Sequence, residues 1–401
     1  MASATAIVST MGPAIGLAML LPQPAFAQAQ VSPVTDTAPI TATGTAQSPP
    51  HIEFDLSMFG GRNPFLIPGE DAFTVGGEVA ARGGAGLDLG PGTRLQADGS
   101  VAFRQYSQGY GNFVTGGVAL ALDHRHNEYL SLHTDASFER ILSIEELTDS
   151  IDSAIDPLSL QDRTVLGQTV TWHSDALTTV SGRVDWNRLV PHDSLLLDKT
   201  SALGATFNAQ RQIDSLTTLG AVGVFTWTKS KTGGDPNAWS VRATASRRMG
   251  HGWRAEVELG IAQTSRLDTF GQRGSGGVQF AGSGQLCHEP GHVSVCINAS
   301  IEPVVTSFRG IQRESAVGAT LNWRTSEYGT ITASADYRRT PQLGPNGDIN
   351  ATRLSARYDH RLDSRMSVFG GVEYRRRTGI GGQPADSAVL QIGITLGIPR
   401  R

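Results

Sequence analysis

From residue 51 onward, the chain alternates between apolar and polar side chains in segments of roughly ten to fourteen residues. In segment 93–106, one set is Leu95, Ala97, Gly99, Val101 and Phe103, and the interleaved set is Arg94, Gln96, Asp98, Ser100 and Arg104. Period-two alternation predicts a β-strand with two unlike faces, because a helix of period 3.6 would mix the two sets. Segments 178–188 and 329–339 repeat the pattern.

The connections between these segments alternate between short turns and longer loops. Short turns are predicted near 90–92, 123–127, 174–175, 212–214, 249–252, 288–291, 325–327 and 362–364. Longer loops are predicted at 60–70, 107–112, 141–161, 190–200, 230–237, 265–275, 303–311, 340–349 and 378–384. This asymmetry is typical of an antiparallel up-and-down transmembrane β-barrel, with turns in the periplasm and loops outside the cell. The segmentation predicts about eighteen strands, with sixteen as the alternative, from His51–Phe59 to Ala385–Ile398.

Composition supports a membrane barrel over a soluble β-sandwich. Hydrophobic residues make up 39% of the chain and charged residues 17%, and glycine is abundant at 47 residues. No apolar run after the N-terminal region is long enough for a transmembrane helix. Strands of about ten residues suit the hydrocarbon thickness, and backbone groups within it require a sheet that closes on itself. The all-β domain is therefore expected to span 51–401, in the outer membrane of a Gram-negative bacterium.

The N-terminal residues predict secretion. An apolar stretch at 15–21 is followed by two prolines and the small-residue site Ala25-Phe26-Ala27. We expect a signal peptide at 1–27, although its first residues lack Lys and Arg. Residues 28–50 are rich in Ala, Thr and Pro without periodicity, which predicts a disordered periplasmic leader.

Charged residues fall on the polar faces of the predicted strands. The formal net charge of −4 gives no sign of a nucleic-acid partner. We expect the lumen to be lined by Arg94, Asp98, Arg104, Arg183, Asp185, Arg242, Glu256, Glu258, Asp336, Arg338, Arg353, Arg357, Asp359, Glu373 and Arg375. Interleaved charges of both signs favour either a hydrated pore or an interior braced by ion pairs.

Loop 141–161 has helical character. Ile144, Leu147, Ile151 and Ile155 recur at helical spacing, Ser143 and Glu146 match a capping box, and Pro157 ends the pattern. Two placements remain open: the loop folds inward and narrows the pore, or it lies across the rim as a lid.

Cys287 and Cys296 are the only cysteines. An even number in a secreted chain predicts a disulfide, and the Pro-Gly turn between them would bring two antiparallel strands together. Metal binding with His288 and His292 is the less favoured alternative, because the spacing matches no zinc pattern.

Catalytic motifs are not found. The cluster 123–126 (DHRH) falls on a predicted turn, where solvated side chains are the simpler interpretation. A nucleophile elbow, a paired-histidine zinc motif, a P-loop and a dinucleotide fingerprint are all missing from the sequence. No enzymatic activity, metal or cofactor is expected.

Segment 286–323 resembles outer-membrane barrels of exopolysaccharide clusters of the sphingan (gellan) type. The resemblance rests on Cys287, Cys296, Ser307, Phe308 and Gly310, and covers about forty residues. It implies a pore that serves export or biosynthesis of a surface polysaccharide, with polysaccharide export proteins as partners. A general diffusion porin and a barrel enzyme acting on lipid or polysaccharide are the alternatives. In each case, outer-membrane lipids, lipopolysaccharide and the barrel assembly machinery are expected partners.

Overall fold

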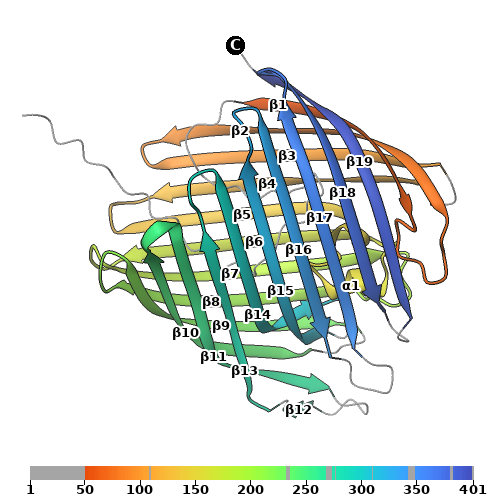
Figure 1. Ribbon diagram of the computed structural model, residues 1–401. Helices are drawn as coiled ribbons and strands as arrows, with labels where there is room; N and C mark the ends of the chain where they lie inside the picture. Colours follow the sequence, from red (N-terminus) through yellow and green to blue (C-terminus); the bar gives the residue numbers. More distant parts are fainter. Residues whose placement is uncertain are drawn as a thin grey trace, which may run out of the picture. The chain divides into compact units, whose positions relative to one another are not determined.

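The computed structural model describes residues 50–107, 110–231, 235–267, 273–275, 277–308, 310–341, 348–379 and 383–399. The predicted signal peptide and all but the last residue of the predicted leader lie outside these residues. Nearly all of the described chain is β-strand, and its strands wrap into one barrel (Figure 1).

The first half of the strands runs β1 His51–Arg62, β2 Phe73–Gly90, β3 Thr93–Tyr106, β4 Asn112–Arg125, β5 Leu130–Leu142, β6 Leu160–His173, β7 Thr178–His192, β8 Thr200–Gln212, β9 Thr217–Ser230 and β10 Asn237–Met249. The second half runs β11 Trp253–Leu267, β12 Arg273–Ser275, β13 Gln279–His288, β14 Val293–Thr306, β15 Gly310–Arg324, β16 Gly329–Thr340, β17 Ile349–Arg361, β18 Met366–Thr378 and β19 Pro384–Pro399. The described residues also form three short helices, η1 Ser143–Glu146, α1 Ile151–Ile155 and η2 Gly250–Gly252.

The sheet closes on itself through eighteen strands. Each long strand pairs antiparallel with the next, and β11 pairs directly with β13. β12 is a short piece that pairs only with the end of β11. β1 pairs with β19 from His51↔Pro399 to Arg62↔Ala388, which joins the first strand to the last and closes the ring. The prediction of eighteen strands is confirmed, and the alternative of sixteen is wrong.

A polar side chain stabilises each of several four-residue turns at one end of the barrel. Asn127, Asp175, Asp214 and Asp363 accept backbone N–H bonds from residues two or three positions later. Donation from the backbone N–H of Leu177 lowers the pKa of Asp175, and donation from Leu216 does the same for Asp214. Local side-chain acceptance of this kind fixes tight turns, so the short connections are defined by their own residues.

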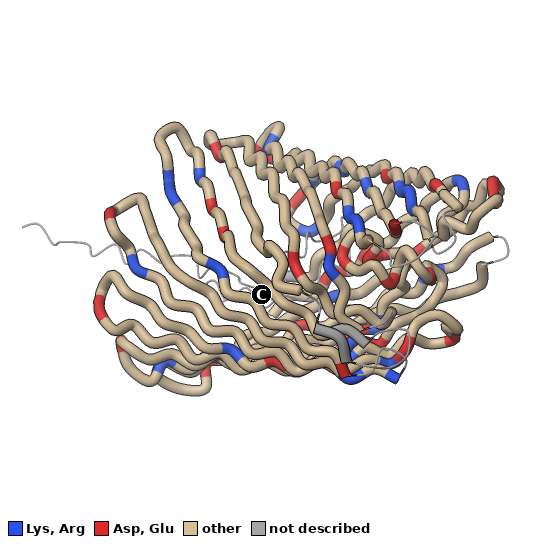
Figure 2. Tube along the Cα trace, turned by 90° about the horizontal axis from the view of Figure 1, so that it is seen from below, with Lys and Arg blue, Asp and Glu red and all other residues tan. Residues whose placement is uncertain are grey.

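The outer face of the barrel is apolar and the inner face is polar. In β1, the outward residues Ile52, Phe54, Leu56 and Met58 are 43–66% exposed, whereas the inward Asp55 and Ser57 are 4% and 3% exposed. A water-soluble protein shows the opposite distribution, and an apolar band of this extent is typical of a lipid-facing wall. Charges of both signs recur along the strands (Figure 2). Among the described residues, no helix is both long and apolar enough to cross a membrane.

Candidate functional site

The connection between β5 and β6, residues 143–159, folds into the barrel and carries η1 and α1 (Figure 1). We call it the constriction loop. Its apolar residues Ile144, Leu147, Ile151 and Ile155 are at most 5% exposed. Of the two predicted placements, the structure has the inward one, because the loop contacts strands β16 to β18 on another part of the wall.

The helical prediction for this loop was only partly right. The chain forms two short helices rather than one, and Ser143 lies inside η1 instead of capping it. The Ser143 hydroxyl bonds Ser159 Oγ at 2.6 Å and accepts from Gln161 Nε2 at 2.7 Å, so it closes the base of the loop. The cap is on α1, where Ser150 Oγ accepts from the Asp152 backbone N–H. α1 ends at Ile155, two residues before Pro157.

A small hydrophobic core forms between this loop and two neighbouring loops. Phe65 and Leu66, which follow β1, and Leu197, which follows β7, pack with the four loop apolar residues. Inward-facing Ile349, Ala351 and Ala385 complete the core at the long-loop end of the barrel. Burial of apolar area is the main force that can hold a loop in a fixed place, so the constriction loop is a folded element of the lumen.

Arginines from the wall bind the backbone of the constriction loop. Arg353 Nη1 donates to the Glu145 carbonyl at 3.4 Å, and Arg338 Nη1 donates to the Asp149 carbonyl at 2.9 Å. Arg377 donates to the Ala154 carbonyl and, at 3.0 Å, to that of Leu66. Guanidinium groups suit this role because they offer several donors in a rigid fork. These three arginines come from β17, β16 and β18.

Carboxylates compensate this buried positive charge. Arg338 pairs with Glu314 at 2.5 Å, and Glu373 accepts from both Arg353 and Arg375. On β3, Arg104 joins Glu78 of the wall to Glu145 of the loop. Arg353 is 0% exposed, and a charge buried to this degree requires such partners.

Acidic residues of the loop are also buried. Asp152 accepts from the backbone N–H groups of Ser307 and Phe308, at 2.7 and 3.1 Å. Burial raises the pKa of Asp152 to about 6, although these N–H groups oppose the shift. Burial, helped by the nearby charge of Glu146, raises the pKa of Asp149 to about 7. Both carboxyl groups therefore titrate near neutral pH.

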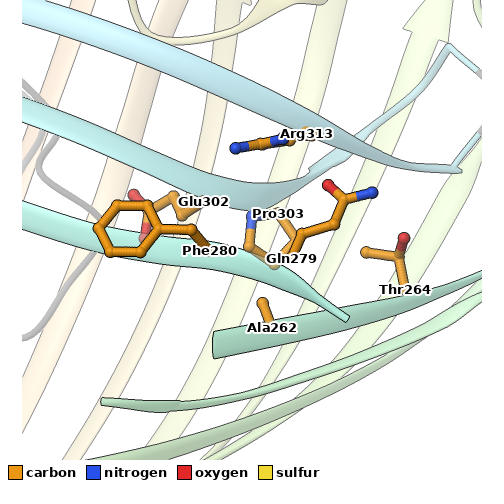
Figure 3. A pocket seen from close by; sticks show the side chains of 7 residues that line it. All are labelled: Ala262, Thr264, Gln279, Phe280, Glu302, Pro303 and Arg313. Carbon is orange, nitrogen blue, oxygen red and sulfur yellow. The ribbon is translucent and has the colours of Figure 1, made fainter. Parts of the chain in front are cut away.

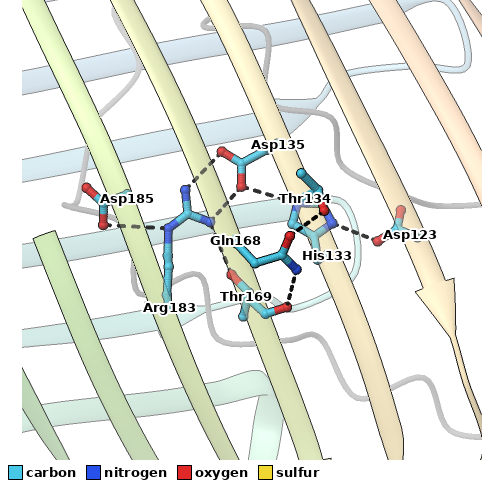
Figure 4. Close-up of polar contacts among 8 residues, drawn as sticks. All are labelled: Asp123, His133, Thr134, Asp135, Gln168, Thr169, Arg183 and Asp185. Carbon is cyan, nitrogen blue, oxygen red and sulfur yellow. Dashed lines mark hydrogen bonds and ion pairs between the residues drawn. The ribbon is translucent and has the colours of Figure 1, made fainter. Parts of the chain in front are cut away.

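A second polar network lies on the wall formed by β4 to β7 (Figure 4). Arg183 binds Asp135 with two hydrogen bonds of 2.7 and 2.9 Å and approaches Asp185 at 3.9 Å. His133 Nδ1 bonds Asp123 at 2.7 Å. The side chains of Arg183, Asp135 and Asp185 keep about a quarter to a third of their surface exposed. This network is open to the lumen.

A glycine makes room for the flat side chains of this network. A Cβ at Gly167 would lie 2.2 Å from an Arg183 nitrogen and 2.7 Å from an Asp135 oxygen. Because Gly167 is paired with both Asp135 and Asp185 in the ladder, it separates the two carboxylates. The arginine can therefore lie along the wall between them.

The structure places all the predicted lumen residues on the inner face of their strands, but pairs only some of them with each other. Arg242 binds Glu258 at 3.3 Å and also Glu302, and Arg357 binds Asp359 and stacks on Phe369. Glu256 pairs with Arg254, Asp98 accepts from Gln96, and Asp336 lies opposite Gly318. Arg94 lies against Gly86 on β2. Contact of these residues with a permeating solute stays a prediction.

Sequence reasoning missed several partners in these networks. Glu78, Glu302, Glu314 and Arg377 lie on the inward parity of their strands, so alternation could have identified them. Glu145 and Asp152 could not be found in this way, because they lie in the loop. Cys287 and Cys296 lie opposite each other on β13 and β14 and are joined by a disulfide.

None of the known family models matches the sequence, and no curated protein matches it. Solved structures resemble the fold over 87% of this chain. OccK2 (OpdF) of Pseudomonas aeruginosa in complex with glucuronate is 12% identical, with 98% of its chain covered and a TM-score of 0.50. A BenF-like porin from Pseudomonas fluorescens Pf-5 and the outer membrane protein OpdK from Pseudomonas aeruginosa are each 12% identical, with 99% covered and TM-scores of 0.48 and 0.47. At this identity the likeness shows the fold, which is a porin-like barrel of eighteen strands.

Proposed function

We propose that this protein is an outer-membrane pore for the passive diffusion of small polar solutes. The observation that carries the proposal is the constriction loop, which is held by wall arginines inside a charged lumen. A folded loop in a polar barrel limits the size of what passes without closing the wall around it. The apolar outer face supports placement in a membrane, and the fold supports the outer membrane of a Gram-negative bacterium.

The polysaccharide role has less support than general diffusion. It rests on the forty-residue resemblance of segment 286–323, and the similar structures add nothing to it. A wide polymer would also have to displace the constriction loop together with its hydrophobic core and its arginine contacts. We therefore place passive diffusion first and export of a polymer second.

Single-channel recording from the refolded protein in a planar bilayer tests the proposal. We expect stable open steps, with permeation of small sugars and exclusion of oligosaccharides in a liposome-swelling assay. Current block by an anionic exopolysaccharide at low concentration would instead favour the export role. A barrel that is folded by heat-modifiable gel mobility but never conducts would contradict the pore, and cleavage of lipid or polymer by that sample would favour an enzyme.

A further inference from the structure

The barrel wall is split between β13 and β14 at the long-loop end. These strands pair only from Gly282↔Ile301 to His288↔Val295, which is seven residue pairs. Beyond that point, residues 279–281 stay paired with β11, and residues 302–306 stay paired with β15. Within the described part of the chain, the two facing edges are not paired with each other. Among the described residues, the backbone groups on these two ordered edges therefore have no strand partner across the gap, and we call the split the β13–β14 seam.

Pro303 explains where the pairing stops. Extending the register of the ladder by two residues from Gly282↔Ile301 would place Pro303 opposite Phe280. Proline has no backbone N–H and is confined to strand edges or bulges, so it favours an unpaired edge at this point. The seam is thus encoded in the sequence of β14.

A shallow pocket that is partly open to the surroundings lies at the seam (Figure 3). Phe280, Pro303 and Arg313 line it from the outward-facing positions of their strands, and Ala262 and Glu302 from the inward-facing ones. Phe280 is 52% exposed on the outer face, and Glu302 lies 3.2 Å from the lumen residue Arg242. Residues from both faces of the wall therefore meet at this pocket.

The chemistry of the seam selects its ligand. Open backbone groups at the edge of a lipid layer are unfavourable unless a polar partner meets them, and a hydrocarbon tail alone offers none. Arg313 adds a cation at the same place, and no ion pair between described residues involves it. Phe280 and Pro303 offer apolar surface next to these polar groups. An anionic head group and an acyl tail complement the two parts.

We propose that the β13–β14 seam is a lateral port that binds the acyl chain of an anionic amphiphile. The tail lies against Phe280 and Pro303, and the head group accepts hydrogen bonds from Arg313 and from the open strand edges. The ligand is either a lipid of the surrounding leaflet or a free fatty acid. This inference goes beyond diffusion through the lumen, and it holds whether or not the pore conducts.

Photo-crosslinking of the full barrel tests the port. In the test variant, a benzophenone amino acid replaces Val304, which lies at the seam and faces inward like Glu302. In the control variant it replaces Val224, which also faces inward and is aligned across the sheet with Ser240 and Ala262. The probes are tritiated dipalmitoylphosphatidylglycerol in phosphatidylcholine vesicles, and tritiated palmitate added to unlabelled vesicles. We expect label at position 304 and not at 224. Capture of the phospholipid identifies the leaflet as the source, and capture of palmitate alone identifies a free amphiphile. Equal labelling at both positions, or none at 304, overturns the port.

Arg313→Gln tests the head-group contact in otherwise native protein. Loss of a charge-assisted hydrogen bond should weaken palmitate binding roughly tenfold. Arg376→Gln is the matched control, since Arg376 is exposed at the same end on a fully paired strand. Equal affinity of the Arg313 variant and the control, or equal capture of neutral and anionic lipid, would overturn the anionic ligand.

Discussion

Two walls of the lumen use the same residue types for different purposes. On β16 to β18, Arg353 is fully buried, pairs with Glu373 and contacts the constriction loop. On β4 to β7, Arg183 pairs with Asp135 but stays partly exposed to the lumen. A buried pair is sensitive to removal of one partner, whereas an exposed pair contributes little to stability. An arginine on the inward face is therefore a structural anchor or a solute-facing charge according to what covers it.

The largest expected effect comes from removing the constriction loop, which contacts the wall of β16 to β18. Replacing residues 145–158 by a short Gly-Ser linker should raise single-channel conductance several-fold, because the loop and its core leave the lumen. Leu195→Ser is the control, since Leu195 is fully exposed in a neighbouring loop and should leave conductance unchanged. Unchanged conductance in the linker variant would mean that the constriction loop does not narrow the pathway.

Breaking one buried anchor should free the loop while the barrel stays folded. Arg353→Met removes the charged donor to the Glu145 carbonyl, while Glu373 keeps Arg375 as a partner. We expect a loss of about 2 kcal/mol in loop docking. Limited proteolysis within 143–159 measures this docking. Arg183→Met on the open wall is the matched control, with an expected cost below about 1 kcal/mol. Equal protease sensitivity of the two variants would contradict the contrast between the walls.

Loop docking should also depend on pH. Asp149 has a pKa of about 7 in the docked loop, above its usual value near 4, so the docked state binds a proton more tightly. Docking should therefore be strongest at low pH and weaken as pH rises towards 7, by up to about 1.4 kcal/mol per pH unit. Current noise from loop opening should increase between pH 5 and 7 and level off above that range. Asp149→Asn should remove the part of this dependence that Asp149 contributes and leave the smaller part due to Asp152, whose pKa is about 6. An increase in current noise towards low pH would contradict the prediction.

The smallest expected effect is on ion selectivity. Arg183→Gln removes one partly exposed cation from the lumen and leaves Asp135 and Asp185 without it. The reversal potential in a salt gradient should shift towards cation preference by a few millivolts, because water and salt screen exposed charges. Gln168→Ala is a suitable control, since Gln168 lies on the outward face of the same region and bonds Thr134. A shift of equal size in both variants would argue against Arg183 as a solute-facing charge.

The sequence predicted the wall far better than the lumen contents. Alternation defined the strands, and the Asn and Asp side chains in the turns fixed where many of them reverse. The split of the loop into η1 and α1 was not predictable, because Ser143 exchanged a capping role for a bond to Ser159 across the loop base. Pairs such as Arg338 with Glu314 lie on neighbouring strands but depend on side-chain direction, and the Arg104–Glu145 pair depends on how far the loop reaches. The β13–β14 seam was not predicted from the sequence, although Pro303 is the residue that favours an unpaired edge there.

Because β1 pairs with β19, the first and last strands of the barrel are neighbours, and one covalent link between them would make the strand order circular. His51 and Pro399 are neighbours in the ladder, so a short linker between them would span a single strand-to-strand distance. New ends could then be opened at a self-contained turn such as Asp214–Leu216 without moving any strand. The natural order of the chain still affects assembly, since contacts between β1 and β19 span nearly the whole sequence and long-range contacts form slowly. Circularly permuted variants would allow the rate of barrel closure to be measured independently of the stability of the closed barrel.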